Sequence, residues 1–299
     1  MSPARPEGRA RRPGATRARL QILAAALLFS TGGAAIKAVD LTGWQIAGFR
    51  SAVAAVLLLV AVPAARRIFD LRIAAVGVAY AATLVCFVLA NRLTTAANTI
   101  FLQSAAPLYL LLLAPWLLGE RLRRRDLVLM AVMAAGLAPF FLARAEPSAT
   151  APEPLAGNLL AALAGISWAF VVVGLRAFGR RDGGGGVALA AVTAGNLIAC
   201  LVALPLALPV TGGSAGDWGI VLYLGTVQVA LGYLFLTAGV RWLPALETSL
   251  LLLVEPVLNP VWAWWLHGER PSGWAMAGGA LILGATAASL IAGDRETAR

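Results

Sequence analysis

Charged side chains are scarce in this chain of 299 residues: Asp, Glu, Lys and Arg make up 13% of it, whereas a soluble domain carries about a quarter. Hydrophobic residues make up 60%, and polar stretches are confined to short connections and the two ends. Such a chain lacks the polar surface that faces water. The composition therefore excludes a soluble globular protein and predicts an all-α integral membrane protein.

Histidine and cysteine are nearly absent as well. The chain has one His and two Cys, and both cysteines, Cys86 and Cys200, lie inside apolar runs. One histidine and two distant cysteines cannot form an ordinary metal site. The run Gly183–Gly186 lacks the lysine of a phosphate-binding loop. We therefore predict no metal, no other cofactor and no nucleotide site.

Basic residues outnumber acidic residues, and the formal net charge is +10. The arginines flank apolar stretches, which is typical of a topology signal rather than of nucleic-acid binding. The basic N-terminal segment resembles a signal peptide, but no soluble domain follows it. We interpret residues 1–19 as a basic cytoplasmic tail. The bias toward Arg and Ala, with Lys37 as the single lysine, fits a GC-rich bacterial genome. We expect the protein in the bacterial cytoplasmic (inner) membrane.

Ten apolar stretches are long enough to cross a bilayer, which takes about 20 residues. They are Leu20–Ile36, Trp44–Val62, Ile73–Ala90, Asn98–Leu118, Leu127–Ala143, Gly157–Phe178, Val187–Leu208, Trp218–Val240, Thr248–His267 and Gly273–Ala292. The longest break between them is rich in Pro and Ala. It predicts a linker at 146–156 between two five-helix units, 20–145 and 157–293, with a second cytoplasmic tail at 294–299.

The basic residues predict the orientation of the helices. If the N-terminus is cytoplasmic, the opposite side holds only Lys37, Arg92, Arg144 and Arg270, and Arg50 falls within a span. All other arginines then lie in cytoplasmic segments. By the positive-inside rule, both termini are expected in the cytoplasm.

The two units carry the same motif at a constant spacing. Thr99–Arg121 and Thr248–Arg270 align without a gap at an offset of 149 residues, with Thr, a mid-helix Pro and a final Gly-Glu-Arg in register. This pattern indicates an internal duplication. Since each unit has five helices, the second copy must enter the membrane inverted. Inverted repeats are typical of transporters that hold a substrate near the midplane between the halves.

The paired proline and Gly-Glu pattern, with the run LLLVEPVLNPVWAWWLHGERPSGWAMAGGALILGA, resembles the drug/metabolite transporter superfamily, EamA type. Ser167-Trp168 keeps the commoner form of the family, whereas Ala106 stands opposite Glu255 and Ser30-Thr31 stands where a tryptophan is common. The resemblance implies secondary transport of small metabolites. One branch of the superfamily exports aromatic and other neutral amino acids.

Glu255 is the first candidate site residue, because an ionisable group deep in a span faces a cavity or a partner. It shares a helical face with Thr248, Asn259 and Trp262. The carboxylate could bind a substrate ammonium or couple transport to protons. Alternatively, it could hydrogen-bond to backbone groups freed by Pro256 and Pro260.

Polar and aromatic residues on other helices complete the predicted substrate site. The whole predicted set is Tyr80, Thr95, Asn98, Thr99, Gln103, Trp168, Tyr233, Glu255 and Asn259, with Pro107, Pro256 and Pro260 as helix-breaking or gating positions. The small polar residues could equally hold helices together, and the rings could be core or interface residues. Lys37 and Arg50 could attract a carboxylate or pair with Asp40, but snorkelling to the interface is favoured.

Two classes of function remain open at this stage. We favour a monomeric carrier in the lipid bilayer that exports small metabolites, neutral or aromatic amino acids above all, with lipophilic cations as an alternative substrate. A membrane-embedded enzyme is disfavoured, because Glu255 has no intramembrane His or Asp partner.

Overall fold

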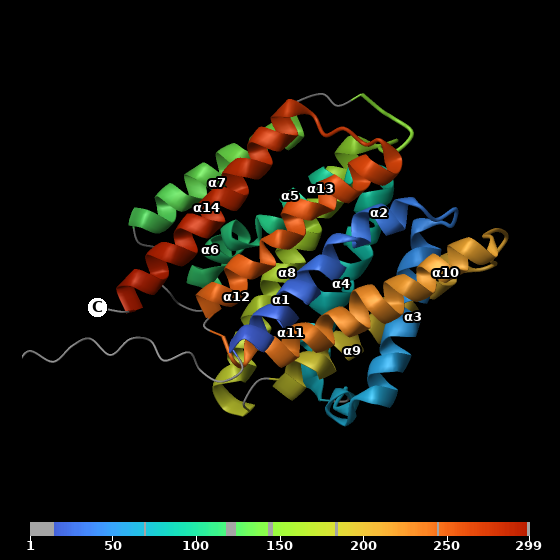
Figure 1. Ribbon diagram of the computed structural model, residues 1–299, viewed down its shortest axis with the longest axis horizontal. Helices are drawn as coiled ribbons and strands as arrows, with labels where there is room; N and C mark the ends of the chain where they lie inside the picture. The colour runs from blue at the N-terminus through green and yellow to red at the C-terminus, as the bar shows by residue number, and fades with distance from the viewer. Residues whose placement is uncertain are drawn as a thin grey trace, which may run out of the picture.

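The computed structural model describes residues 15–68, 70–117, 124–142, 146–182, 185–243 and 245–297. Ten helical segments in these ranges are long and apolar enough to cross a membrane, and they correspond one by one to the ten predicted stretches. No β-strand occurs in the described ranges; the linker contributes one isolated bridge between Ser148 and Ala151. The prediction of an all-α protein with ten membrane helices is confirmed, and Figure 1 shows the helices packed into one bundle.

The elements of the first half are α1 Ala15–Ser30, α2 Gly32–Lys37, α3 Gly43–Ala61, a 3-10 turn Pro63–Arg66, α4 Leu71–Leu93, α5 Ala96–Ser104, α6 Ala106–Leu117 and α7 Arg124–Leu142. Those of the second half are α8 Pro154–Asp182, α9 Gly185–Ala207, α10 Ala215–Tyr223, a π-helical segment η2 Leu224–Leu231, α11 Gly232–Val240, α12 Ala245–Leu252, α13 Val254–His267 and α14 Gly273–Thr297. Four membrane spans are therefore compound: α1–α2, α5–α6, α10–η2–α11 and α12–α13.

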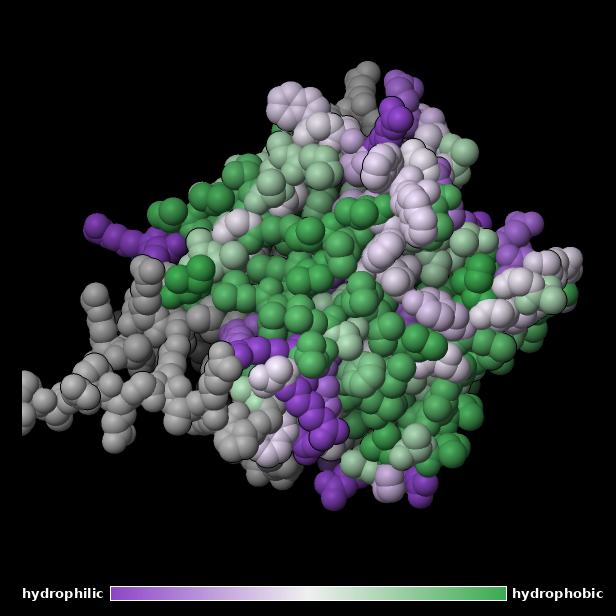
Figure 2. Space-filling model, in the orientation of Figure 1, coloured by the Kyte–Doolittle hydropathy of each residue, from purple (hydrophilic) through white to green (hydrophobic). Residues whose placement is uncertain are grey.

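The outer surface of the bundle is apolar. Large hydrophobic side chains such as Val60, Leu142 and Leu201 are more than half exposed, and the visible face in Figure 2 is hydrophobic over most of its middle, with polar residues toward its margins. Because lipid tails are as apolar as a protein core, such helices need no polar face. The surface matches a protein embedded in a bilayer.

Contacts between the two halves follow a two-fold pattern. α4 packs on α8 as α1 packs on α11, and α3–α9 and α7–α14 each pair an element with its counterpart in the other half. The α5–α13 contact joins the fourth span to its counterpart, the ninth. This set of pairs maps onto itself when the halves are exchanged. The arrangement is what two inverted copies of one unit produce.

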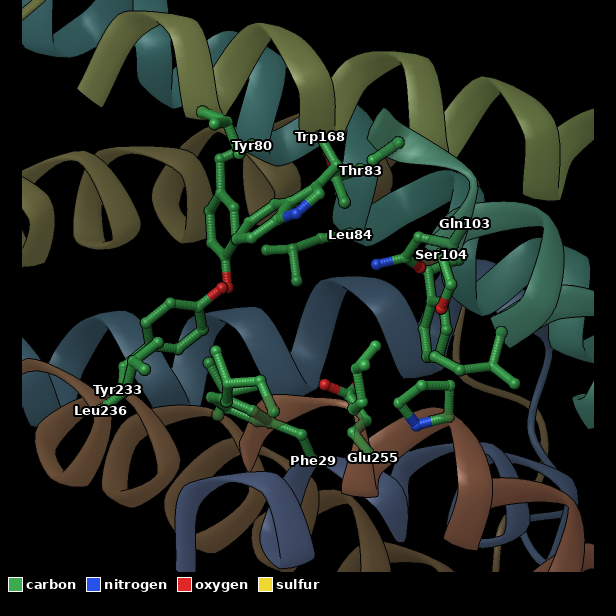
Figure 3. A pocket seen from close by; sticks show the side chains of 18 of the residues that line it. Phe29, Tyr80, Thr83, Leu84, Gln103, Ser104, Trp168, Tyr233, Leu236 and Glu255 are labelled. Atoms are coloured by element: carbon green, nitrogen blue, oxygen red, sulfur yellow. The ribbon is translucent and has the colours of Figure 1, made fainter. Parts of the chain in front are cut away.

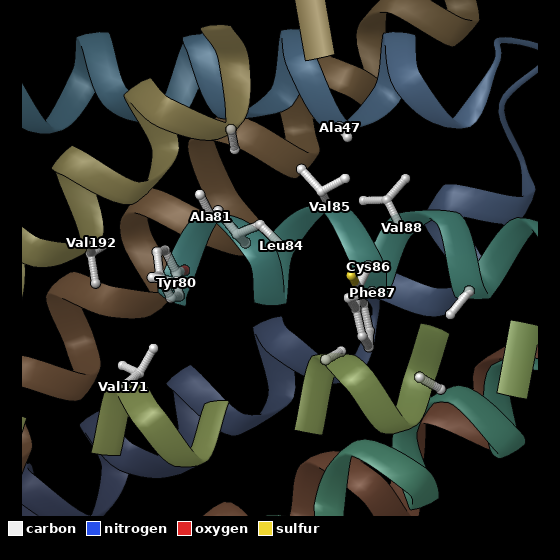
Figure 4. Packing of buried hydrophobic residues seen from close by; sticks show 14 of the residues in the cluster. Ala47, Tyr80, Ala81, Leu84, Val85, Cys86, Phe87, Val88, Val171 and Val192 are labelled. Atoms are coloured by element: carbon white, nitrogen blue, oxygen red, sulfur yellow. The ribbon is translucent and has the colours of Figure 1, made fainter. Parts of the chain in front are cut away.

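The centre of the bundle is formed by α4, whose buried side chains include Leu84, Val85 and Val88 (Figure 4). α4 and α9 approach closely at two glycines. A Cβ atom on Gly195 would lie 2.8 Å from the carbonyl oxygen of Gly77. Small residues at such a crossing let the backbones of membrane helices come together.

Two spans break next to a proline. α5 ends at Ser104 and α6 begins at Ala106, just before Pro107; α12 ends at Leu252 and α13 begins at Val254, just before Pro256. A proline cannot donate to the carbonyl four residues earlier and clashes with it, so both breaks have the same cause. Pro260, by contrast, lies inside α13, which continues to His267, so the expected break at that position is wrong.

Candidate functional site

A cavity of about 300 Å³ lies between the two halves near the middle of the spans. It is lined by Phe29, Arg50, Tyr80, Thr83, Leu84, Phe87, Ile100, Gln103, Ser104, Ala106, Pro107, Leu110, Trp168, Val172, Gln228, Val229, Tyr233, Leu236, Ser249, Leu252, Leu253, Glu255 and Pro256. Figure 3 shows most of these side chains around the open space. Its volume lies at the lower end of the range for small-molecule sites, about 300–1,000 Å³.

The residues that line the cavity correspond between the two halves at the offset of the internal duplication. Ile100, Gln103, Ser104, Ala106 and Pro107 of the α5–α6 span line the cavity, and so do their counterparts 149 residues later, Ser249, Leu252, Leu253, Glu255 and Pro256. Both sets surround a helix break. The cavity therefore lies on the pseudo-two-fold axis, where inverted repeats place their substrate.

Aromatic rings form one wall of the cavity. The ring centroids of Tyr80 and Tyr233 are 5.6 Å apart, those of Tyr80 and Trp168 are 6.4 Å apart, and those of Phe29 and Tyr233 are 5.1 Å apart. The hydroxyl groups of Tyr80 and Tyr233 point toward one another (Figure 3). Three of the predicted site residues, on α4, α8 and α11, thus form one cluster that suits an apolar or aromatic group.

Glu255 lies in the first turn of α13 and reaches the cavity. Its side chain is partly exposed, and the structure gives it no hydrogen bond or ion pair to a described residue. The alternative role, a hydrogen bond from this carboxyl group to backbone groups freed by the prolines, is therefore not seen among the described residues. Glu255 is available to a ligand.

Gln103 and Ser104 lie across the cavity from the two tyrosines (Figure 3). The Oε1 atom of Gln103 is buried without a partner. Gln228, in the π-helical segment, also faces the cavity, and its Nε2 donates to the carbonyl of Phe29 at 3.5 Å. π-helical turns are rare and are frequent at functional sites. No periodicity in the sequence indicated this segment.

The position of Arg50 differs from the prediction made from the sequence. We expected it to snorkel to the interface with Lys37, but it is 1% exposed and lines the cavity. Its Nη2 donates to the carbonyl of Leu84 at 3.3 Å. Lys37 does not snorkel either: its ammonium is buried and pairs with Glu269 at 3.1 Å rather than with Asp40.

Four predicted binding residues lie outside the cavity: Thr95, Asn98, Thr99 and Asn259. Thr95 caps α5 by accepting from the backbone N–H of Asn98, and Thr99 donates to the carbonyl of Thr95. Asn98 donates to Asn158 across the two halves at 3.1 Å. Asn259 is fully buried, and neither polar atom of its side chain has a partner. Asn98 therefore joins two helices, the alternative role for small polar side chains, whereas the bonds of Thr95 and Thr99 stay within α5.

The end of the bundle that contains Lys37 is closed by further polar contacts; we call it the Lys37 end. It lies where α2 meets the end of α13 (Figure 1). Lys37 donates to the carbonyls of Thr94 and Thr150, and Glu269 accepts from the backbone N–H of Ala96 at 2.6 Å. His267 contacts the carbonyl of Ala34 at 2.8 Å. The counterpart of Glu269 in the first half, Glu120 in Gly119-Glu120-Arg121, lies outside the described residues.

A ten-helix bundle of two inverted units, with a small cavity on the axis between them and breaks in the helices that line it, is the architecture of a secondary transporter. A family model agrees. The EamA-like transporter family matches residues 16–142 and again 155–291, so the chain belongs to this family, within the drug/metabolite transporter superfamily, and its two halves are two copies of one domain.

Individual relatives are more distant. The pseudopaline exporter CntI of Pseudomonas aeruginosa, in strains UCBPP-PA14 and PAO1, is 28% identical over 209 residues, which cover 69% of this chain and 70% of the exporter. One crystal structure superposes with a TM-score of 0.60 at 24% sequence identity, covering 94% of this chain and 99% of that chain. The likeness to that structure shows the fold alone. No cluster of His, Cys, Asp and Glu that could hold a metal occurs among the described residues.

Proposed function

We propose that this protein is an alternating-access carrier that exports small metabolites, neutral and aromatic amino acids above all, across the bacterial cytoplasmic membrane. The observation that carries the proposal is the cavity on the pseudo-two-fold axis, with an aromatic wall on one side and the unpartnered carboxyl group of Glu255 on another. The rings suit an apolar side chain, and a carboxylate suits an ammonium group.

Several features support this assignment. Family membership supports transport, and a distant relative is an exporter of a metabolite. Because the two halves are copies of one unit, each half can adopt the conformation of the other, which would open the cavity to the opposite side. The proposed site comprises Tyr80, Gln103, Trp168, Tyr233 and Glu255, with the breaks at Pro107 and Pro256 as candidate gating positions.

The test is counterflow in proteoliposomes. Vesicles loaded with unlabelled L-phenylalanine should accumulate radiolabelled L-phenylalanine by a saturable route, and neutral amino acids should compete for it. Vesicles without the protein are the control. If no amino acid in a panel of neutral and aromatic substrates shows saturable flux, amino-acid transport is wrong.

A second candidate substrate is a lipophilic cation, which the combination of Glu255 and the aromatic wall would also accept. Overexpression in cells separates the two candidates. Resistance to toxic amino-acid analogues such as p-fluorophenylalanine supports the first, whereas resistance to ethidium without resistance to the analogues supports the second.

A further inference from the structure

Arg50 places a guanidinium group in the wall of the cavity, inside a membrane span. It is the eighth residue of α3, which begins at Gly43, so its Cα lies about 10 Å along the helix from that end at 1.5 Å per residue. The side chain is 1% exposed and turns toward α4, where it contacts Leu84. It does not reach the end of the helix.

The guanidinium group has few partners in this structure. Of its five N–H donors, one nitrogen, Nη2, donates to the carbonyl of Leu84, and Nε is buried without a partner. Within the part of the chain that the structure describes, Arg50 takes part in no ion pair. Tyr80 and Tyr233 line the same cavity as Arg50.

A buried guanidinium group without an ionic partner destabilises the folded protein unless an anion binds to it. Arginine keeps its positive charge in proteins, and a buried charge is destabilising when it is unpaired. Ionisable residues inside membrane spans mark substrate paths when they face a cavity. A purely structural arginine would be paired by the protein, as Lys37 is paired by Glu269.

We propose that Arg50 binds the carboxylate of the transported molecule, an inference that rests on the proposed function and defines its substrate class. A guanidinium group matches a carboxylate with two parallel hydrogen bonds. Glu255 lines the same cavity without pairing with Arg50, so the cavity offers one positive and one negative group to a single ligand. The substrate class is therefore a molecule with both a carboxylate and an ammonium group, and amines that lack the carboxylate bind weakly.

The experiment compares three competitors of L-phenylalanine counterflow in proteoliposomes: L-phenylalanine, L-phenylalaninamide and phenethylamine. All three carry the ring and an ammonium group, but only the first has a carboxylate. For the unaltered protein we expect L-phenylalanine to compete about 10- to 100-fold better than the other two, the range for hydrogen bonds to a charged group. Equal competition by the three compounds overturns the role of Arg50 while leaving the carrier function standing.

Two substitutions of Arg50 test whether this residue causes the preference for the carboxylate. In binding measurements on the purified protein, Arg50→Gln is expected to abolish the preference for the carboxylate, and Arg50→Lys, which keeps the charge but not the fork of donors, to reduce it. Arg241→Gln is the matched control, because Arg241 is exposed and contacts the ring of Trp242. A preference that survives in both Arg50 variants contradicts the proposal. Absence of L-phenylalanine flux and binding in the unaltered protein overturns the proposal together with amino-acid transport.

Discussion

Two glutamates, one inside the ninth membrane span and one just after it, show how surroundings decide the role of a residue. Glu269 is 4% exposed, pairs with Lys37 and accepts from the backbone N–H of Ala96, so the protein itself balances its charge. Glu255, 14 residues earlier in the chain, reaches the cavity and has no partner among the described residues. We therefore propose a structural role for Glu269 and a ligand-binding role for Glu255.

Replacing Glu255 with Gln should weaken transport of L-phenylalanine and of phenethylamine alike. The amide keeps the size of the side chain but loses a charge-assisted bond to the ammonium group, worth about 1.5–3 kcal/mol, so we expect the apparent affinity to fall about tenfold or more in counterflow assays. Glu247→Gln, at the exposed pair with Arg19, is the control and should change little. Undiminished transport by the Glu255 variant would remove this residue from the site.

Helical periodicity predicted which faces of the helices point inward but not how deep each residue lies. Glu255 and Asn259 share one face, as expected, and both point into the bundle, yet only Glu255 reaches the cavity. The position of the cavity along the helix depends on how the two halves pack, which one helix does not encode. The direction of the Arg50 side chain was predicted wrongly for a related reason. A long side chain can turn toward either end of its helix, and the carbonyl of Leu84 that Arg50 contacts belongs to another helix.

At the scale of elements, a glycine on α9 lies directly against the aromatic wall. A Cβ atom on Gly195 would lie 2.6 Å from Cδ1 of Tyr80 and 2.8 Å from the carbonyl oxygen of Gly77. The variant Gly195→Ala must therefore shift the ring or separate α9 from α4. Overpacking of this kind costs about 1–3 kcal/mol, and we expect a lower melting temperature together with weaker binding of L-phenylalanine.

Gly219→Ala is the matched control, because no atom lies within 4 Å of a Cβ added at that position in α10. Ligand binding by the control should equal that of the unaltered protein. If Gly195→Ala binds L-phenylalanine normally, the close approach of α9 does not set the position of Tyr80.

The spans themselves were predictable, because a bilayer demands runs of apolar residues of a fixed length. The breaks at Pro107 and Pro256 were predictable from the chemistry of proline. The π-helical segment Leu224–Leu231 was not predicted. Within it, Gly225 approaches α3 so closely that a Cβ atom there would lie 2.6 Å from the carbonyl oxygen of Arg50. Such a contact has no signature in the sequence of either helix.

At the scale of the whole molecule, the inverted arrangement predicts which connections lie on the same side of the membrane. The N-terminus and Arg67 should be cytoplasmic, and Ser148 and Arg270 periplasmic, because the arginines flank the spans asymmetrically. Single cysteines replacing the exposed residues Arg67, Ser148 and Arg270, in a chain without Cys86 and Cys200, test this in intact cells. A membrane-impermeant maleimide should label the latter two positions only.

A cysteine at Arg121, outside the described residues, completes the topology test. It ends the first copy of the repeated motif and should be protected, whereas Arg270, at the end of the second copy, should be labelled. Labelling of both positions from one side of the membrane contradicts the inverted repeat.

We expect the ion pair at the Lys37 end to control whether the bundle opens at that end. Lys37, the last residue of the first span, pairs with Glu269, two residues after the ninth span ends, and their side chains are 5% and 2% exposed. Breaking a buried pair by removing one partner costs about 3–5 kcal/mol, whereas replacing both partners by apolar groups is often neutral. Even about 1.4 kcal/mol changes the ratio of two conformations tenfold. Glu269→Gln should therefore favour a conformation that is open at this end.

Asn259 supplies the reporter, because it is fully buried and lies in α13 between Pro256, which lines the cavity, and His267 at the Lys37 end. In a chain without native cysteines, a cysteine at position 259 should react with a maleimide at least about tenfold faster in the Glu269→Gln background. The double variant Lys37→Met, Glu269→Leu should react more slowly than Glu269→Gln, because no unpaired charge remains buried. Equal reactivity in all three backgrounds would show that this ion pair does not hold the Lys37 end closed, and faster reaction in the double variant would mean that loss of packing, not an unpaired charge, opens it.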